Sequence, residues 1–189
     1  MSMTVATPRV LGDAVPGGLT RDVALVGAGA VLTGIAAQIA LPLPFTPIPL
    51  TMQTLAVLLV AASLGTKRGL ASMLLYVGVG AAGVPWFTNG TSGFTASFGY
   101  AVGFLLAALL VGRLAEQGGT RRPLNTAGVM IAGNLAIYAV GVPWLMFAAN
   151  IGLGKALALG VLPFLVGDLI KVAVAAGAMP SAWKLSDKH

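Results

Sequence analysis

The chain contains no cysteine, and its single histidine, His189, is the last residue. Without cysteine it has no disulfides, no thiolate metal ligands and no cysteine nucleophile. It also lacks the GxxxxGK[ST] phosphate-binding loop, because the nearest stretch, GLGKA at 152–156, has neither the spacing nor the Ser or Thr. These absences predict a protein that is not an enzyme, holds no metal or cofactor, and cannot hydrolyse ATP by itself.

Charged residues are scarce. They make up 8% of the chain, against about 25% in ordinary soluble domains, while 57% of the 189 residues are hydrophobic. Three long ranges, 23–66, 69–112 and 123–154, contain no charged side chain. Because a membrane-spanning helix needs about 20 apolar residues, each range can hold one or two spans. Residues 1–22 carry charges but no early apolar run, so we expect an integral membrane protein without a removable signal peptide.

Apolar blocks bounded by charges or by Pro and Gly clusters predict six transmembrane helices. Their expected ranges are 23–41, 50–65, 69–83, 98–115, 124–142 and 159–179. A β-barrel is disfavoured, because the blocks are long runs rich in Leu, Ala and Gly without period-two alternation. We therefore expect an all-α integral membrane protein. Residues 23–180 would form its six-helix membrane domain, between an N-terminal segment, 1–22, and a C-terminal tail, 181–189.

The basic residues predict the orientation of these helices. The net charge of +6 is scattered in ones and twos between apolar blocks, which indicates topology signals rather than nucleic-acid binding. With six spans, one side of the membrane carries nine basic residues and the other only Lys155. The nine are Arg9, Arg21, Lys67, Arg68, Arg113, Arg121, Arg122, Lys184 and Lys188. Since basic loops stay inside, both termini are expected in the cytoplasm.

Three unusual loops then fall on the outer side. They are LPLPFTPIPLTMQT at 41–54, GVPWFTNGTSGF at 83–94 and GVPWLMFAANIGLGKA at 141–156. Their mixture of prolines, aromatics and polar residues indicates loops that fold back as walls or lids of a binding site. For Trp86 and Trp144 the alternative is an interfacial aromatic belt.

The last apolar block, FLVGDLIKVAVAAGAMP at 164–180, contains Asp168 and Lys171. A charge at the centre of a membrane helix costs roughly 2.5 to 3.5 kcal/mol, so both need a reason to be there. Three residues apart, they lie on nearly the same helix face. They therefore form either a structural ion pair or a joint binding site for a polar ligand, and intramembrane charges favour the second reading.

The sequence resembles the BioY family, the biotin-specific substrate-binding (S) components of energy-coupling factor (ECF) transporters. The resemblance runs from about residue 24 to 180. It rests on PFTPIPLTMQTLAVLLVAASLGTKRGLASMLLYVGVGAAGVPWF, on NGTSGF followed by SFGYAVGF, and on LPFLVGDLIKVAVAA. It implies high-affinity capture of biotin from outside by a six-helix protein of the bacterial cytoplasmic membrane. It also implies a transmembrane coupling subunit and two cytoplasmic ATPase subunits as partners.

The resemblance also implies roles for single residues. Asp168 and Lys171 match the acid and base of the family that contact biotin, and Asn89 lies in the loop that adds a polar contact. Thr51 and Gln53 match the proline-rich segment, where ligand contact and loop bracing are both open. The aromatic residues expected to flank the biotin rings are Trp86, Tyr100 and Trp144. Residues 97–100 carry no charge, although some members have a basic residue there to hold the biotin carboxylate.

The first predicted helix carries small residues four apart, Ala30 with Gly34 and Ala36 with Ala40. Such a pattern lets helices approach closely. It serves either packing inside the bundle or, as the resemblance implies, docking on the coupling subunit.

Two other functions remain open from the sequence. One is a self-sufficient, proton-coupled vitamin transporter in which Asp168 relays the proton. The other is a scaffold or membrane enzyme without a small ligand.

Overall fold

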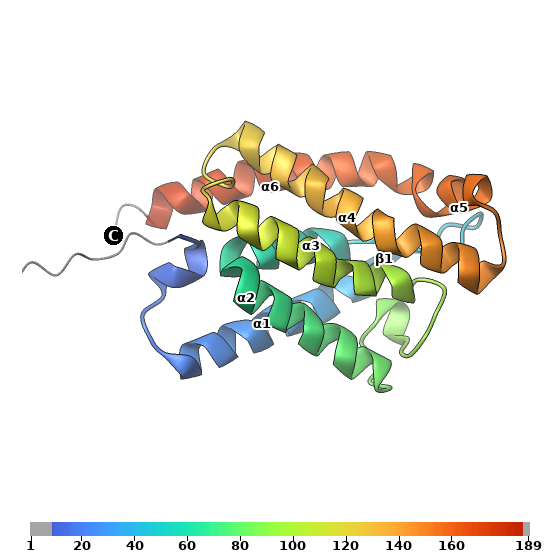
Figure 1. The fold of residues 1–189 in the computed structure, drawn as a ribbon, viewed down its shortest axis with the longest axis horizontal. Coiled ribbons are helices and arrows are strands. Elements are labelled where there is room, and N and C mark those ends of the chain that lie inside the picture. The colour runs from blue at the N-terminus through green and yellow to red at the C-terminus, as the bar shows by residue number, and fades with distance from the viewer. Residues whose placement is uncertain (1–8, 187–189) are drawn as a thin grey trace, which may run out of the picture.

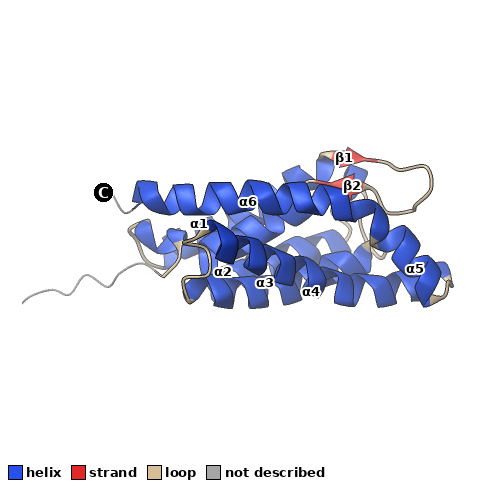
Figure 2. Ribbon diagram, turned by 90° about the horizontal axis from the view of Figure 1, so that it is seen from above, coloured by secondary structure: helices blue, strands red, loops and turns tan. Residues whose placement is uncertain are grey.

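The computed structural model describes residues 9–186. The expectations for Lys188, for His189 and for the outermost parts of the two terminal segments therefore lie outside the described residues. The described chain is almost entirely helical (Figures 1 and 2). Its α-helices are α1 (Leu19–Gln38), α2 (Gln53–Ala81), α3 (Phe98–Glu116), α4 (Pro123–Ala149), α5 (Leu153–Gly160) and α6 (Leu165–Ser186). Short 3-10 turns lie at Leu11–Ala14 (η1), Thr88–Gly90 (η2) and Leu162–Phe164 (η3).

Helix α2 consists of two halves that fold back on each other at Gly65. This glycine has φ 78° and ψ −176°, a backbone conformation that interrupts the helix and that other residues rarely adopt. Gln53 Nε2 donates a hydrogen bond to Tyr76 Oη at 2.9 Å. In a straight helix residues 23 apart would be separated by roughly 35 Å. The boundary expected between the helices 50–65 and 69–83 thus coincides with a sharp reversal of the chain.

Five helical stretches of the described residues are long and apolar enough to cross a membrane, counting α2 as one and residues 153–186 as another. The prediction of an all-α membrane protein is confirmed. The number of crossings depends on how the two halves of α2 are counted. It stays a prediction, as does the orientation of the termini.

Two predicted segments differ from the structure. The stretch 141–156, expected as an outer loop, is mostly helical, because α4 continues through Pro143 to Ala149 and α5 begins at Leu153. Its buried face explains this: Leu145 is fully buried, and Gly141 packs closely against the ring of Tyr100. The last helix, expected at 159–179, is broken at η3, so that α6 begins at Leu165 and extends to Ser186.

The helices pack side by side around one apolar core. The central helix α3 contacts α2 on one side and α4 on the other, α1 packs on α2, and α6 packs on α4 (Figure 1). Large side chains such as Tyr76, Met73, Met130 and Leu145 are fully buried between them. Strands β1 (Ala40–Leu41) and β2 (Leu50–Thr51) pair antiparallel and close the loop 42–49 at the end opposite the C-terminus (Figure 2).

Helix α1 turns its small residues toward its own bundle. Ala30 is fully buried, Ala36 is 7% exposed, and Gly34 packs against the ring of Trp86. The expectation that these residues and Ala40 form a partner surface is therefore wrong for Ala30, Gly34 and Ala36, because residues of this chain already occupy their face; Ala40 lies in β1 and is half-buried. The exposed face of α1 instead carries larger apolar residues, including Val31 and Ile35.

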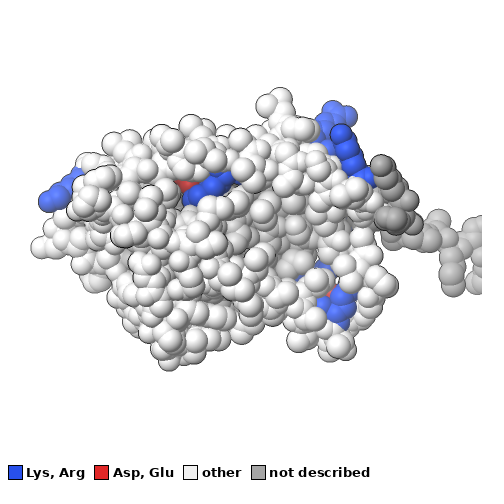
Figure 3. All heavy atoms as spheres, turned by 180° about the vertical axis from the view of Figure 1, so that it is seen from behind, with Lys and Arg blue, Asp and Glu red and all other residues white. Residues whose placement is uncertain are grey.

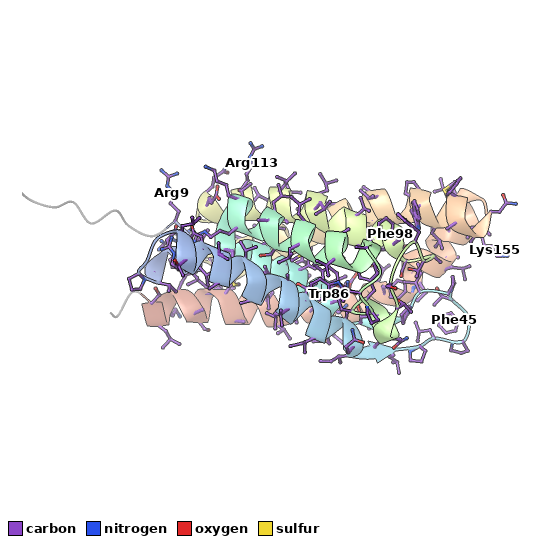
Figure 4. All side chains as sticks on the ribbon, turned by 90° about the horizontal axis from the view of Figure 1, so that it is seen from below. Arg9, Phe45, Trp86, Phe98, Arg113 and Lys155 are labelled. Carbon is purple, nitrogen blue, oxygen red and sulfur yellow. The ribbon has the colours of Figure 1, made fainter. Side chains whose placement is uncertain are left out.

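The charged side chains gather at the two ends of the bundle. Arg9 and Arg113 lie at one end, whereas Lys155 lies at the other, near Phe45 (Figure 4). Between the ends the surface is almost free of charge. In Figure 3 the middle of the face is white apart from one small spot of acidic and basic atoms, and the other coloured atoms lie toward the two ends.

Candidate functional site

A cavity lies between the helices near the end of the bundle that carries the β1–β2 loop. It encloses about 680 Å³ of space free of protein atoms, a volume that includes open solvent. Its apolar wall includes Ile48, Leu50, Phe87, Phe98, Phe104, Ile137 and Phe164. Its polar groups are Thr51, Gln53, Thr54, Thr88, Thr95, Ser97, Tyr100, Asn134, Tyr138, Asp168 and Lys171.

Asp168 and Lys171 form a buried ion pair in the wall of this cavity. Each is 8% exposed, and Lys171 Nζ lies 3.3 Å from Asp168 Oδ1. They come from the first two turns of α6, where a spacing of three places them on one face. This face is turned toward α4, so the helix presents both charges to the cavity instead of to lipid.

Two further side chains hold the pair in place. Tyr138 on α4 donates its hydroxyl to Asp168 Oδ2. Lys171 Nζ donates to Thr54 Oγ1 at 2.8 Å. An ammonium has three donors, and two are used by Thr54 and Asp168, which leaves one for a ligand. The carboxylate likewise keeps lone pairs for additional donors.

Gln53 braces the cavity wall with hydrogen bonds to its own chain. Its Nε2 donates to Tyr76 Oη at 2.9 Å, and its Oε1 accepts from Thr88 Oγ1 at 3.2 Å. Both ends of the amide are therefore engaged by the second half of α2 and by η2. This arrangement favours loop bracing over direct ligand contact for Gln53.

The loop before α3 is fastened to α1 by Gln38. Its Nε2 lies within hydrogen-bond distance of the carbonyl oxygens of Gly34 (3.0 Å), Trp86 (3.1 Å) and Phe87 (3.1 Å). Its Oε1 accepts the backbone N–H of Gly90 at 3.0 Å. Because Phe87 and Thr88 line the cavity, Gln38 fixes one wall of the site from outside.

The residues predicted for the site divide into those that line the cavity and those that lie outside it. Thr51, Gln53, Tyr100, Asp168 and Lys171 all line the cavity. Tyr100 lies against Tyr138 with ring centroids 6.3 Å apart and donates its hydroxyl to the carbonyl of Gly160 at 2.9 Å.

Asn89, Trp86 and Trp144 do not line the cavity, contrary to expectation. Asn89 is exposed at the tip of η2, where its φ of 57° turns the loop. Trp86 lies behind the wall, with Nε1 donating to Tyr76 O at 3.0 Å. Trp144 supports the wall from α4 by donating to Thr95 O at 3.0 Å and packing on Phe98.

Sequence reasoning missed several cavity residues. Thr54 follows the predicted Gln53 directly, and Thr88 precedes the predicted Asn89. Asn134 and Tyr138 had a usable signal, because they are polar residues four apart on a helix that has no charge. The phenylalanines of the wall had none, since core and site phenylalanines look alike in sequence.

A second charged group lies at the opposite end of the molecule. Arg68, just after the reversal in α2, donates to Asp13 of η1, and its Nη1 lies 3.8 Å from Asp22 at the start of α1. Burial raises the pKa of Asp13, but its hydrogen bonds from Arg68 and from the backbone of Val10 and Arg9, with the charge of Arg68, outweigh this and lower it below 3.8. This cluster ties three segments of the chain together.

Comparisons with known proteins agree on one family. Residues 3–188 match the family model described as the BioY family. The chain is 37% identical over 150 residues to the biotin transporter BioY2 of Lactococcus lactis subsp. cremoris, covering 78% of this chain and 81% of that protein. It is also 37% identical over 156 residues to the biotin transporter BioY of Thermotoga maritima, covering 80% and 90%.

One solved structure has the same fold. It is the crystal structure of an S-component for biotin from an ECF-type ABC transporter, which matches with a TM-score of 0.78. The match covers 87% of this chain and 92% of that chain at 24% sequence identity. At this identity the likeness speaks for the fold.

Proposed function

The chain belongs to the BioY family, and from this we propose that it captures biotin from outside the cell with high affinity, as the substrate-binding component of an ECF transporter. The resemblance read from the sequence is thereby confirmed at the level of the family. The chain is a transport protein rather than an enzyme, and a multi-pass protein of the bacterial plasma membrane.

The observation that carries the proposal is the buried Asp168–Lys171 pair in the cavity wall. Biotin contains a cyclic urea with two N–H donors and one carbonyl acceptor. A carboxylate accepts from the N–H groups, and an ammonium donates to the carbonyl oxygen. Tyr138 and Thr54 hold both charges in place, so the pair is oriented before the ligand arrives.

The apolar wall supports the same ligand. Phe87, Phe98, Phe104 and Phe164 line the cavity and can surround the sulfur ring and the aliphatic chain of biotin. The hydroxyls of Thr88, Thr95 and Ser97 lie in the wall as well. They are the groups available for the tail carboxylate, since Lys171 is the one basic residue among those that line the cavity.

The proposed topology has six spans, with the halves of α2 crossing separately and both termini in the cytoplasm. The reversal at Gly65 supports separate crossings, because the two halves run antiparallel. The charge distribution supports the orientation, since Arg9 and Arg113 lie at one end and Lys155 at the other (Figure 4). The cavity lies near the Lys155 end and would open to the outside.

Uptake then needs partners that supply energy. The sequence has no phosphate-binding loop, so we propose a transmembrane coupling subunit and two cytoplasmic ATPases. The solved structure of the same fold is itself a component of an ECF-type transporter, which supports this arrangement.

The protein purified in mild detergent tests both levels of the proposal. After denaturation, released biotin should be close to one molecule per chain. In cells, co-expression with the coupling and ATPase subunits should make uptake of labelled biotin depend on ATP hydrolysis. Absence of biotin from the protein, together with no binding of added biotin, would refute biotin capture. ATP-independent uptake at the same rate would refute only the partnership.

A further inference from the structure

Asn134 lies in the wall of the cavity with an amide that has no hydrogen-bond partner among residues 9–186. It is 7% exposed, and so more than nine-tenths buried. The amide of Gln53, in contrast, is bonded at both ends by this chain. Asn134 lines the cavity with its amide unpaired within the described residues, so its donors and acceptor are available to a ligand there.

The position of Asn134 relates it to Lys171. Helices α4 and α6 run antiparallel (Figures 1 and 2), and Tyr138 meets Asp168 between them. Asn134 precedes Tyr138 by about one turn, and Lys171 follows Asp168 by about one turn. Both steps lead away from the Lys155 end of the bundle, so Asn134 and Lys171 lie at the same depth, on facing helices.

We infer that Asn134 binds the urea carbonyl of the ligand together with Lys171, and so makes the cavity specific for a cyclic urea. The inference rests on the proposed function. A carbonyl oxygen has two lone pairs, and here it takes one hydrogen bond from the free N–H of Lys171 and one from Asn134 Nδ2. Asp168 accepts from a urea N–H one turn nearer the outside.

Thr126, a buried polar residue elsewhere on α4, differs from Asn134 because its side chain is hydrogen-bonded within the helix. Thr126 is fully buried, and its hydroxyl donates to the carbonyl of Arg122 at 2.9 Å, within the same helix. Most polar residues of membrane bundles are satisfied in such ways by their own chain. Asn134 is not paired in this way within residues 9–186, and it lines the cavity, where a ligand can pair with it.

Binding of three ligands to two variants tests this assignment. Asn134→Leu keeps the size of the side chain and removes the amide, and Thr126→Val is the matched control on the same helix. The ligands are biotin, 2-thiobiotin, whose urea oxygen is replaced by the weaker acceptor sulfur, and biotin amide, whose tail is changed.

Loss of one hydrogen bond to a well-placed acceptor predicts an affinity about 10-fold lower for biotin and for biotin amide in Asn134→Leu. For 2-thiobiotin the change should be about 2-fold or less, since sulfur is the weaker acceptor. Thr126→Val should bind all three like the unaltered protein.

The outcomes separate the inference from the proposed function. No binding of biotin by the unaltered protein overturns the proposed function and the inference with it. Binding by the unaltered protein, with an equal loss for all three ligands or none for biotin, overturns the inference alone. A smaller loss for biotin amide than for biotin overturns it too, because Asn134 would then contact the tail.

The thermal stability of the ligand-free protein provides an independent readout. Because the amide has no partner within the described chain, Asn134→Leu should melt at the same temperature as the unaltered protein or higher. A clearly lower melting temperature would show that the amide supports the fold, and would overturn its assignment to the ligand.

Discussion

Two acid–base pairs lie at different depths of this bundle, and their surroundings differ. Asp168 and Lys171 are each 8% exposed and face a cavity. Asp13 and Arg68 lie at the end of the bundle, with side chains 30% and 17% exposed, and they join η1 to the reversal in α2. Charges that hold segments together need only each other. Charges that keep free donors and acceptors toward a cavity fit the proposed role in binding a ligand.

The difference gives each pair its own expected response to mutation. Breaking the cavity pair should affect ligand binding in every variant, and stability only when one charge is left alone. The end cluster consists of Asp13, Asp22 and Arg68. Breaking it should lower the stability of the fold without changing ligand binding.

The largest effect is expected for Asp168→Leu alone. It leaves Lys171 buried without its counter-charge, which predicts a loss of about 3–5 kcal/mol in the free energy of unfolding. Asp168→Leu combined with Lys171→Met removes both charges and should restore stability to that of the unaltered protein or above. Unfolding in detergent without biotin measures both. If the single and double variants were equally unstable, the pair would be part of the fold rather than of the site.

A smaller effect is expected for Arg68→Met. It removes the partner of Asp13 and leaves η1 less firmly held, which predicts a loss of about 1–2 kcal/mol in unfolding free energy. Affinity for biotin should stay within about 2-fold, because the cluster lies at the other end of the bundle. Arg122→Met is the matched control, an exposed arginine at the same end, and should be nearly neutral. A marked loss of biotin affinity in Arg68→Met would contradict the prediction that this cluster stabilises the fold without affecting ligand binding.

The smallest effect is the pH dependence of the end cluster. The pKa of Asp13 in the folded protein is below its ordinary value of 3.8. Its ionised form is therefore favoured by folding, so its contribution to stability is complete above pH 3.8 and is lost as the pH falls through the folded pKa. Melting temperatures between about pH 5 and 3 should fall less steeply for Asp13→Asn than for the unaltered protein. Identical slopes would show that Asp13 contributes nothing to the pH dependence of stability between about pH 5 and 3.

The sequence predicts the membrane helices well, because long blocks without charge leave few alternatives. It also identifies Asp168 and Lys171, since charges within such a block are conspicuous. The prediction from sequence fails where contacts with residues distant in sequence determine the local conformation. The letters GVPW occur twice; at 83–86 they follow the end of α2, with Gly83 at φ 109°, whereas at 141–144 they lie inside α4. Four identical residues cannot tell these environments apart.

The same limit applies to the aromatic residues of the site. Trp86 and Trp144 are conspicuous in sequence, yet they support the wall from behind through hydrogen bonds to Tyr76 and Thr95. Tyr138, which contacts Asp168 directly, is less conspicuous in sequence. Contacts between helices depend on the rotation of each helix, which apolar composition alone does not fix because every face is apolar.

The most direct test of the central claim, that Asp168 and Lys171 bind the ligand, is calorimetric titration of biotin into the purified double variant, Asp168→Leu with Lys171→Met, beside the unaltered protein. Charge-assisted hydrogen bonds contribute about 1.5 to 3 kcal/mol each, so the folded double variant should lose at least ~3 kcal/mol of binding free energy, a drop of more than about 100-fold in affinity. Near-normal affinity for biotin in a folded double variant would contradict the account, because the pair would then be a structural contact beside the cavity.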